Sequence, residues 1–184
     1  MQWRNSPDRY GAGLVTIHWL MVVLIAGGWL LVQLKDSTPD DWHRPVQFVH
    51  NSAGLLVLML LIIRLAWRLV DPPPAIEPTR FGQMAIWAAK AGHGALYLLM
   101  LAVPIAGITL VFAAGRNLNV FGLFEIASPW TRDRAFAGSV HEVHEWLANA
   151  LIILALLHAA AALVHHWVLR DQTLRRMLLP RRVG

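Results

Sequence analysis

Two histidines, His144 and His158, lie fourteen residues apart in a strongly apolar segment of the chain. At about 100° per residue, fourteen residues make four helical turns less about 40°, so both imidazoles share one helix face, about 21 Å apart along the axis. Ionisable side chains at membrane depth are costly and usually functional. Two such side chains near opposite leaflets predict that this segment supplies one ligand to each of two stacked cofactors.

The elements that must position these histidines are four apolar stretches, each long enough to span a bilayer. They cover about residues 14–34, 49–70, 92–113 and 140–168, and residues 81–90 could form an interfacial helix that leads into the third. The first is long and no convincing cleavage site follows it, which favours an uncleaved helix over a signal peptide. Because 57% of the 184 residues are hydrophobic, little sequence remains for a soluble part. The sequence predicts one membrane-embedded domain over residues 1–184, an all-α integral membrane protein built as a four-transmembrane-helix bundle.

The distribution of positive charge sets the expected orientation. Eleven of the sixteen Lys and Arg residues flank the same ends of the spans: Arg4, Arg9, Arg64, Arg68, Arg80, Lys90, Arg170, Arg175, Arg176, Arg181 and Arg182. The other five fall in the first and third loops: Lys35, Arg44, Arg116, Arg132 and Arg134. The positive-inside rule then predicts that both termini are cytoplasmic. The net charge of +5 reflects this bias, so we do not expect a nucleic-acid partner, and Arg64 and Arg68 are expected to snorkel to the cytoplasmic interface.

The chain contains no cysteine. This excludes disulfides, thiolate metal sites, iron–sulfur clusters and covalent attachment of haem through a Cys-x-x-Cys-His run. A metal in this protein therefore depends on imidazole, carboxylate or thioether ligands.

With cytoplasmic termini, four histidines sort into two pairs by depth. His50 and His144 begin the second and fourth spans on the outer side, whereas His18 and His158 lie toward the inner side. Each pair links two helices at one depth, which suits a planar cofactor with an imidazole on each side of its metal. Haem is the expected occupant, and bis-histidine ligation favours electron transfer because it leaves no open iron position. Small residues that would give a flat ring clearance follow three of these histidines by one turn: Gly54, Ala148 and Ala162.

Three alternatives remain open on the residues alone. The histidines could be hydrogen-bonded across helices or line a proton or ion path, which would make the protein a haem-free transporter. His93 lies at much the same depth as His18, so either could face His158. His165, His93 and Lys90 could form a cytoplasmic-side site for a quinone headgroup and its protons, or could simply face water and lipid headgroups.

Four runs of residues carry a resemblance to a known family. They are Thr16–Leu20, Val49–Gly54, Ala91–Gly107 with Pro104, and His144–His166, and a shorter run at Asp171–Leu174 accompanies them. Together they cover nearly the whole chain, which resembles the bacterial cytochrome b561 family. The resemblance implies an inner-membrane, multi-pass, di-haem b-type cytochrome whose axial iron ligands are His18, His50, His144 and His158. It also implies that His18, rather than His93, faces His158.

The same resemblance implies a function but assigns no catalytic residue. Some family members are thought to oxidise superoxide at the outer face and to pass electrons to ubiquinone, so we expect an oxidoreductase of the superoxide:quinone type. Arg116, Arg132 and Arg134 could steer superoxide inward, or could serve only loop solubility, since Glu125 and Asp133 share their loop. The alternative function is a membrane anchor and electron conduit for a partner oxidoreductase subunit of the hydrogenase or formate dehydrogenase type.

Overall fold

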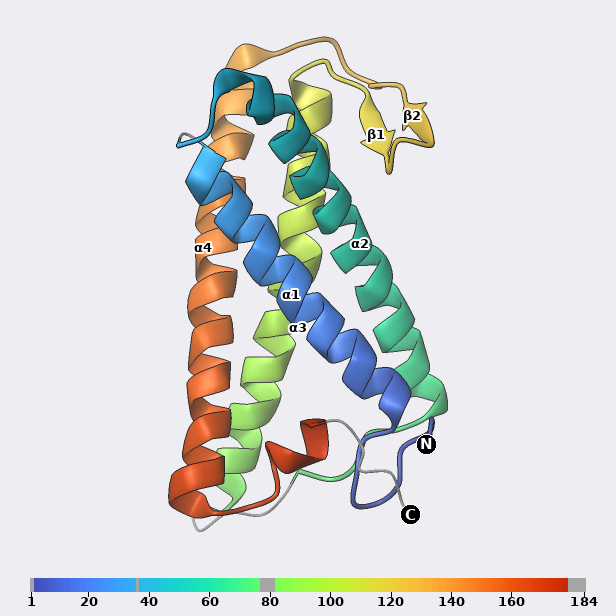
Figure 1. Ribbon diagram of the computed structural model, residues 1–184, viewed down its shortest axis with the longest axis vertical. Coiled ribbons are helices and arrows are strands. Elements are labelled where there is room, and N and C mark those ends of the chain that lie inside the picture. Colours follow the sequence, from blue (N-terminus) through green and yellow to red (C-terminus); the bar gives the residue numbers. More distant parts are fainter. Residues whose placement is uncertain (1, 36, 77–81, 179–184) are drawn as a thin grey trace.

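Four long helices make up most of the protein in the computed structural model, which describes residues 2–35, 37–76 and 82–178. They are α1 (Ala12–Lys35), α2 (His43–Val70), α3 (Gly82–Ala113) and α4 (Arg134–Val164), and they run alternately up and down the bundle (Figure 1). Within the described residues, four helices are long and apolar enough to cross a membrane. The prediction of an all-α integral membrane protein with four transmembrane helices is thus confirmed.

The two ends of the bundle differ in what they carry. We call the end where α1 begins and α4 ends the terminal end, and the opposite end the hairpin end (Figure 1). The hairpin end carries two short antiparallel strands, β1 (Leu118–Val120) and β2 (Phe124–Ile126), with Val120 paired to Phe124. Gly122 lies in the connecting turn with φ +75°, a conformation that favours glycine. The sequence predicts only a loop here, because strands of three residues leave no period to detect.

The predicted spans and the observed helices agree closely where the helices end. α1, α2 and α3 end at Lys35, Val70 and Ala113, within a residue of the predicted limits, and α4 runs on through a π-helical turn, His165–Leu169. α2, α3 and α4 begin well before the predicted limits, because their first turns include polar residues, whereas α1 begins only two residues early, at Ala12. Residues 82–90 of the predicted interfacial helix belong to α3 itself. Phe81, together with Arg80, Arg181 and Arg182 of the charge count, lies outside the described residues.

Local capping fixes the helix ends around the hairpin. Gly115, two residues after the end of α3, adopts φ +66°, and the N–H of Arg116 donates to the carbonyl of Val111, which satisfies a carbonyl at the helix end. Asp133 caps α4 by accepting a hydrogen bond from the N–H of Phe136. The N–H of Asp133 also bonds the carbonyl of Ala113, so the end of α3 and the start of α4 are tied together.

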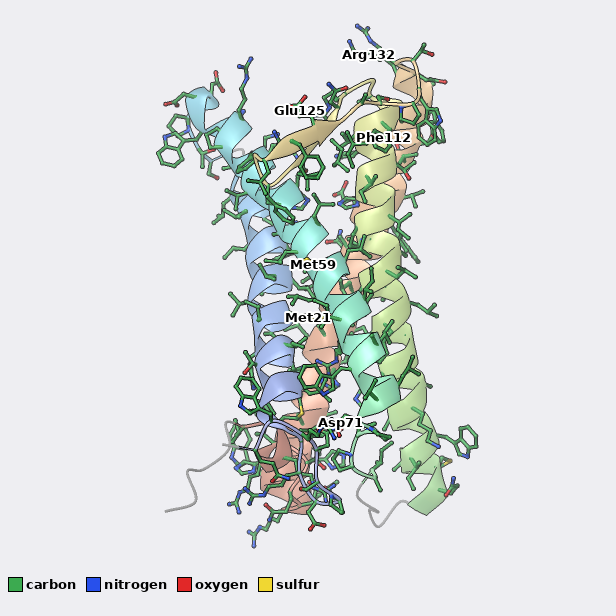
Figure 2. The ribbon with its side chains drawn as sticks, turned by 90° about the vertical axis from the view of Figure 1, so that its right-hand side faces the viewer. Met21, Met59, Asp71, Phe112, Glu125 and Arg132 are labelled. Atoms are coloured by element: carbon green, nitrogen blue, oxygen red, sulfur yellow. The ribbon has the colours of Figure 1, made fainter. Side chains whose placement is uncertain are left out.

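The helices pack as two close pairs that are joined through α2 and α3. α1 packs along α2 and α3 along α4, whereas contact between α1 and α4 is sparse. A buried apolar cluster comprises Met21, Val57, Leu60 and Leu61, and Figure 2 shows Met21 midway along the bundle. Among the described residues, Leu151 is the sole buried apolar side chain of α4. Histidines, together with a hydrogen bond from the indole of Trp29 to the side-chain oxygen of Asn149, therefore connect α4 to α1 and α2 rather than a packed apolar core.

At the terminal end, hydrogen bonds join the segments that flank the helices to one another and to α1. The backbone N–H and side-chain amide of Asn5 bond the carboxylate and the carbonyl of Asp71, at 2.9 Å each. The indole of Trp67 donates to the same carboxylate, and Figure 2 shows Asp71 at this end. The indole of Trp19 donates to the carbonyl of Met177, which holds the C-terminal tail against α1 (Figure 1).

Candidate functional site: two histidine pairs

The first pair lies toward the hairpin end and joins α2 to α4. The ring centroids of His50 and His144 are 6.1 Å apart and the rings are nearly perpendicular. Nδ1 of His50 lies 3.0 Å from the carbonyl oxygen of Gly28, and Nδ1 of His144 lies 3.0 Å from that of Val103. A carbonyl oxygen only accepts, so each Nδ1 carries the hydrogen and donates it. Each Nε2 is therefore left with a free lone pair, the arrangement typical of metal-binding histidines.

Gly107 of α3 makes room for one of these rings. A Cβ atom at this position would lie 3.2 Å from Cε1 of His144, closer than ordinary van der Waals contact. The absence of a side chain thus lets the imidazole lie directly against α3, where it reaches Val103. Gly54, one turn after His50, has open space where its Cβ would be, as expected if a flat group is to pass there.

The second pair lies toward the terminal end and joins α1 to α4. The ring centroids of His18 and His158 are 6.4 Å apart, and His93 of α3 stands 5.3 Å from His158. No hydrogen bond to the rings of His18 or His158 occurs within the described part of the chain. The structure therefore gathers three histidines at this depth, and only two at the other.

The dimensions of the two pairs suit one iron ion between the rings of each. A metal–imidazole bond is about 2 Å long, so two such bonds and half of each ring span about 6 Å between centroids. The separations of 6.1 and 6.4 Å meet this requirement, whereas the 5.3 Å between His93 and His158 is too short. Within the described residues, no cluster of three or more His, Cys, Asp or Glu could hold a metal ion by itself. A porphyrin would supply the four missing ligands, so the donor set fits haem.

The three residues predicted for a quinone or proton site are not joined to one another. His165 begins the π-helical turn, and its Nδ1 lies 2.5 Å from the carboxylate of Asp171. The ammonium group of Lys90 lies over the ring of Trp87, 5.3 Å from its centroid. Within residues 82–178, no hydrogen bond or ion pair connects His93, His165 and Lys90.

Asp171 is a site residue whose role the sequence does not predict. In the sequence it appears only within the Asp171–Leu174 run that supports the family resemblance. Burial by itself would raise the pKa of Asp171, but hydrogen bonds from the backbone N–H of Thr173, from His165 and from the Thr173 hydroxyl hold the pKa below its usual value. The carboxylate is thus ionised at neutral pH and accepts the Nδ1–H of His165. It fixes the orientation of that ring where the chain turns back beneath α4.

A second group that the sequence does not predict lies beside the terminal-end histidines. Nε of Arg64 and a terminal nitrogen of Arg68 both donate to the hydroxyl of Tyr97, at 3.1 Å each. The two guanidinium groups are thus directed to α3 rather than outward to the interface, where snorkelling would take them. A signal existed in the sequence, because Arg64 follows His50 by the same fourteen residues that separate His144 from His158.

The architecture and the histidine pairs define a class of protein. A four-helix membrane bundle that presents histidines from facing helices at two depths is the arrangement of a membrane cytochrome b. The model of the prokaryotic cytochrome b561 family matches residues 9–180, and the chain belongs to this family.

Individual relatives cover almost the full length of the chain. Cytochrome b561 homolog 2 of Escherichia coli is 37% identical over 182 residues, which is 97% of this chain and 95% of the relative. The probable superoxide oxidase CybB of Yersinia pestis is 34% identical, over 95% of this chain and 98% of its own. Cytochrome b562 of Cereibacter sphaeroides is 30% identical, over 91% and 93%. The protein is therefore a multi-pass bacterial inner-membrane cytochrome that binds b-type haem and transfers electrons.

Proposed function

We propose that the protein carries electrons across the inner membrane from a donor on the outer side, with superoxide as the candidate, to ubiquinone. The observation that carries this proposal is the pair of sites on α4, where His144 and His158 face His50 and His18 at two depths. Two b-type haems bound there would supply reversible one-electron redox chemistry at both depths. The four histidines would serve as axial iron ligands, with the Nδ1–H groups of His50 and His144 held by backbone carbonyls.

The proposed orientation places the terminal end in the cytoplasm. It rests on the excess of Lys and Arg at that end, which favours retention on the cytoplasmic side. The hairpin end, with Arg116, Arg132 and Arg134, then faces outward, and Figure 2 shows Arg132 at its extremity. These three arginines would attract an anionic donor locally, beside the acidic Glu125 and Asp133 of the same loop. The printed name of the Yersinia pestis relative, a probable superoxide oxidase, supports superoxide as that donor.

The proposed quinone site lies at the terminal end, near His93, His165 and Lys90. Reduction of a quinone requires protons as well as electrons, so a titratable group near the cytoplasm is needed. Asp171 accepts the Nδ1–H of His165, which leaves Nε2 of that ring free to accept a proton from water and to donate it onward. Lys90 is exposed beside Trp87 and would add positive charge at the headgroup level.

The test is reduction of the purified protein by generated superoxide, with and without a soluble ubiquinone analogue. We expect b-type absorption bands, two haems per chain, reduction within the superoxide pulse, and reoxidation when the quinone is added. A protein without b-type bands would exclude the haem proposal and favour a histidine-lined transporter. A di-haem protein that superoxide does not reduce, and that co-purifies with a larger oxidoreductase subunit, would favour the anchor and electron conduit.

A further inference from the structure

The arginine and tyrosine group at the terminal end has an excess of hydrogen-bond donors. Arg64 and Arg68 each use one N–H on the hydroxyl of Tyr97, which thereby accepts two hydrogen bonds. A tyrosine oxygen has no further acceptor capacity, whereas its own O–H remains a donor. Each guanidinium has five N–H groups, so most of the donors in this group have no partner among the described residues.

Among the described residues, no carboxylate pairs with either of the two positive charges. Within the described residues, the ion pairs are those of His43 with Asp40 and of His165 with Asp171, and neither includes Arg64 or Arg68. Both arginines are half-buried in a membrane-spanning helix, where an uncompensated charge is costly. The guanidinium of Arg68 also lies 5.7 Å from the centre of the Tyr97 ring, which stabilises it only in part. A group of this kind favours an anion with several acceptor oxygens.

The position of the group indicates which anion. Arg64 lies one helical interval of fourteen residues beyond His50, at the depth of His18 and His158, and it is close enough to both for electrostatic coupling. Tyr97 lies one turn from His93 on α3, which brings the hydroxyl to the same depth. Haem b carries two propionate side chains at one edge, and carboxylates are the groups that arginine binds most strongly.

We propose that Arg64, Arg68 and Tyr97 form a carboxylate-binding site for the propionates of the haem held by His18 and His158. This inference rests on the proposed haem ligation. The site orients the ring so that its charged edge meets the two guanidinium groups and its apolar body lies between the helices. Its positive charge also favours the reduced haem over the more positive oxidised haem, which raises the midpoint potential of this haem.

The test is a redox titration of the wild-type protein and of Arg64→Gln, Arg68→Gln and Tyr97→Phe. We expect each arginine variant to lower the ratio of reduced to oxidised terminal-end haem at a fixed potential about tenfold, a fall of about 59 mV for one electron. Tyr97→Phe should lower this ratio less, and Arg64→Lys should keep the ratio close to its wild-type value. The component that disappears in His18→Ala identifies the terminal-end haem. Arg9→Gln is the matched control, because Arg9 is an exposed cation at the same end that hydrogen-bonds through its backbone.

The titration is repeated in vesicles of phosphatidylcholine alone and with phosphatidylglycerol, because a lipid phosphate could satisfy the same donors. Equal effects of the arginine variants in both vesicles support the propionate site, whereas an effect only with phosphatidylglycerol would overturn it in favour of lipid. Unchanged potentials in a di-haem protein would also overturn it. Loss of the terminal-end haem alone supports the site. If the arginine variants lose both haems, Tyr97→Phe becomes the deciding variant. An unchanged midpoint potential of its terminal-end haem would overturn the inference. Absence of b-type bands in the wild type would refute the haem ligation itself.

Discussion

The two histidine pairs are built from the same bundle but are held in different ways. At the hairpin end, His50 and His144 each donate a hydrogen bond to a backbone carbonyl of a neighbouring helix. At the terminal end, the rings of His18 and His158 make no hydrogen bond within the described residues, and Arg64 and a third histidine lie close by. The hairpin-end pair is therefore oriented by the backbone, whereas the terminal-end pair lies in an environment set mainly by charge.

This difference has a consequence for the direction of electron transfer. A histidine that donates Nδ1–H to a carbonyl is a more basic ligand, which stabilises oxidised iron and lowers its potential. Nearby guanidinium groups act in the opposite sense at the terminal end. Electrons would then move favourably from the hairpin end to the terminal end, the direction that the proposed function requires.

The largest expected effect is the loss of one haem from one end. Replacing His50 or His144 by Ala should remove the hairpin-end haem and leave the other, because each haem depends on its own pair of ligands. The haem-to-protein ratio should fall by half in a pyridine haemochromogen assay, with one b-type component left in a redox titration. His141→Ala, which alters an exposed histidine one turn away on α4, is the control. Loss of both haems from every single variant would show that the two ends are not independent.

A smaller effect is expected from crowding the hairpin-end pair. Gly107→Ala would place a Cβ 3.2 Å from the ring of His144, and overpacking of this kind costs about 1–3 kcal/mol. The ring should move away from Val103, so the hairpin-end haem should be lost at a lower temperature while the terminal-end haem is unaffected. Absorbance during a thermal ramp measures this. Gly138→Ala, at a position with open space on α4, should leave both haems unchanged, and an equal loss in that variant would contradict the explanation.

The two ends should also differ in midpoint potential in the unmodified protein. The haem that remains in His144→Ala should titrate at a higher potential than the haem that remains in His18→Ala. A potentiometric titration of the two variants side by side measures the order. The reverse order would mean that hydrogen bonding and nearby charge do not control the potentials of the two sites.

The smallest effect concerns the chain reversal below the terminal-end pair. The pKa of Asp171 is lower in the folded protein than its usual value of 3.8, so its contacts stabilise this turn above that pH and are lost as the pH falls below it. At neutral pH, Asp171→Asn should loosen the tail. The measurement is the rate of tryptic cleavage at Arg175, which should rise in the variant while both haems are retained. Asp40→Asn, at the hairpin end, should leave the cleavage rate unchanged. An unchanged cleavage rate in Asp171→Asn would refute the role of Asp171 in holding the tail.

Much of the fold could be predicted because hydropathy reports the lipid-facing length of each helix directly. The ends at Lys35, Val70 and Ala113 follow from it, but the polar first turns of α2, α3 and α4 carry no such signal. The depth of each histidine could be inferred in the same way. The bonds of His50 and His144 to Gly28 and Val103 could not, because they depend on how neighbouring helices are rotated about their axes. The contact of His165 with Asp171 likewise depends on the π-helical turn, which no periodic pattern in the sequence predicts.

Because α4 supplies a histidine to both pairs, the number of residues between His144 and His158 is as constrained as their identity. A single residue inserted between them would turn everything beyond it by about 100° and shift it by about 1.5 Å. The facing histidines on α1 and α2 could not follow, since each is fixed in its own helix. We therefore expect that insertions in α4 are not tolerated between His144 and His158, and are tolerated better outside this interval.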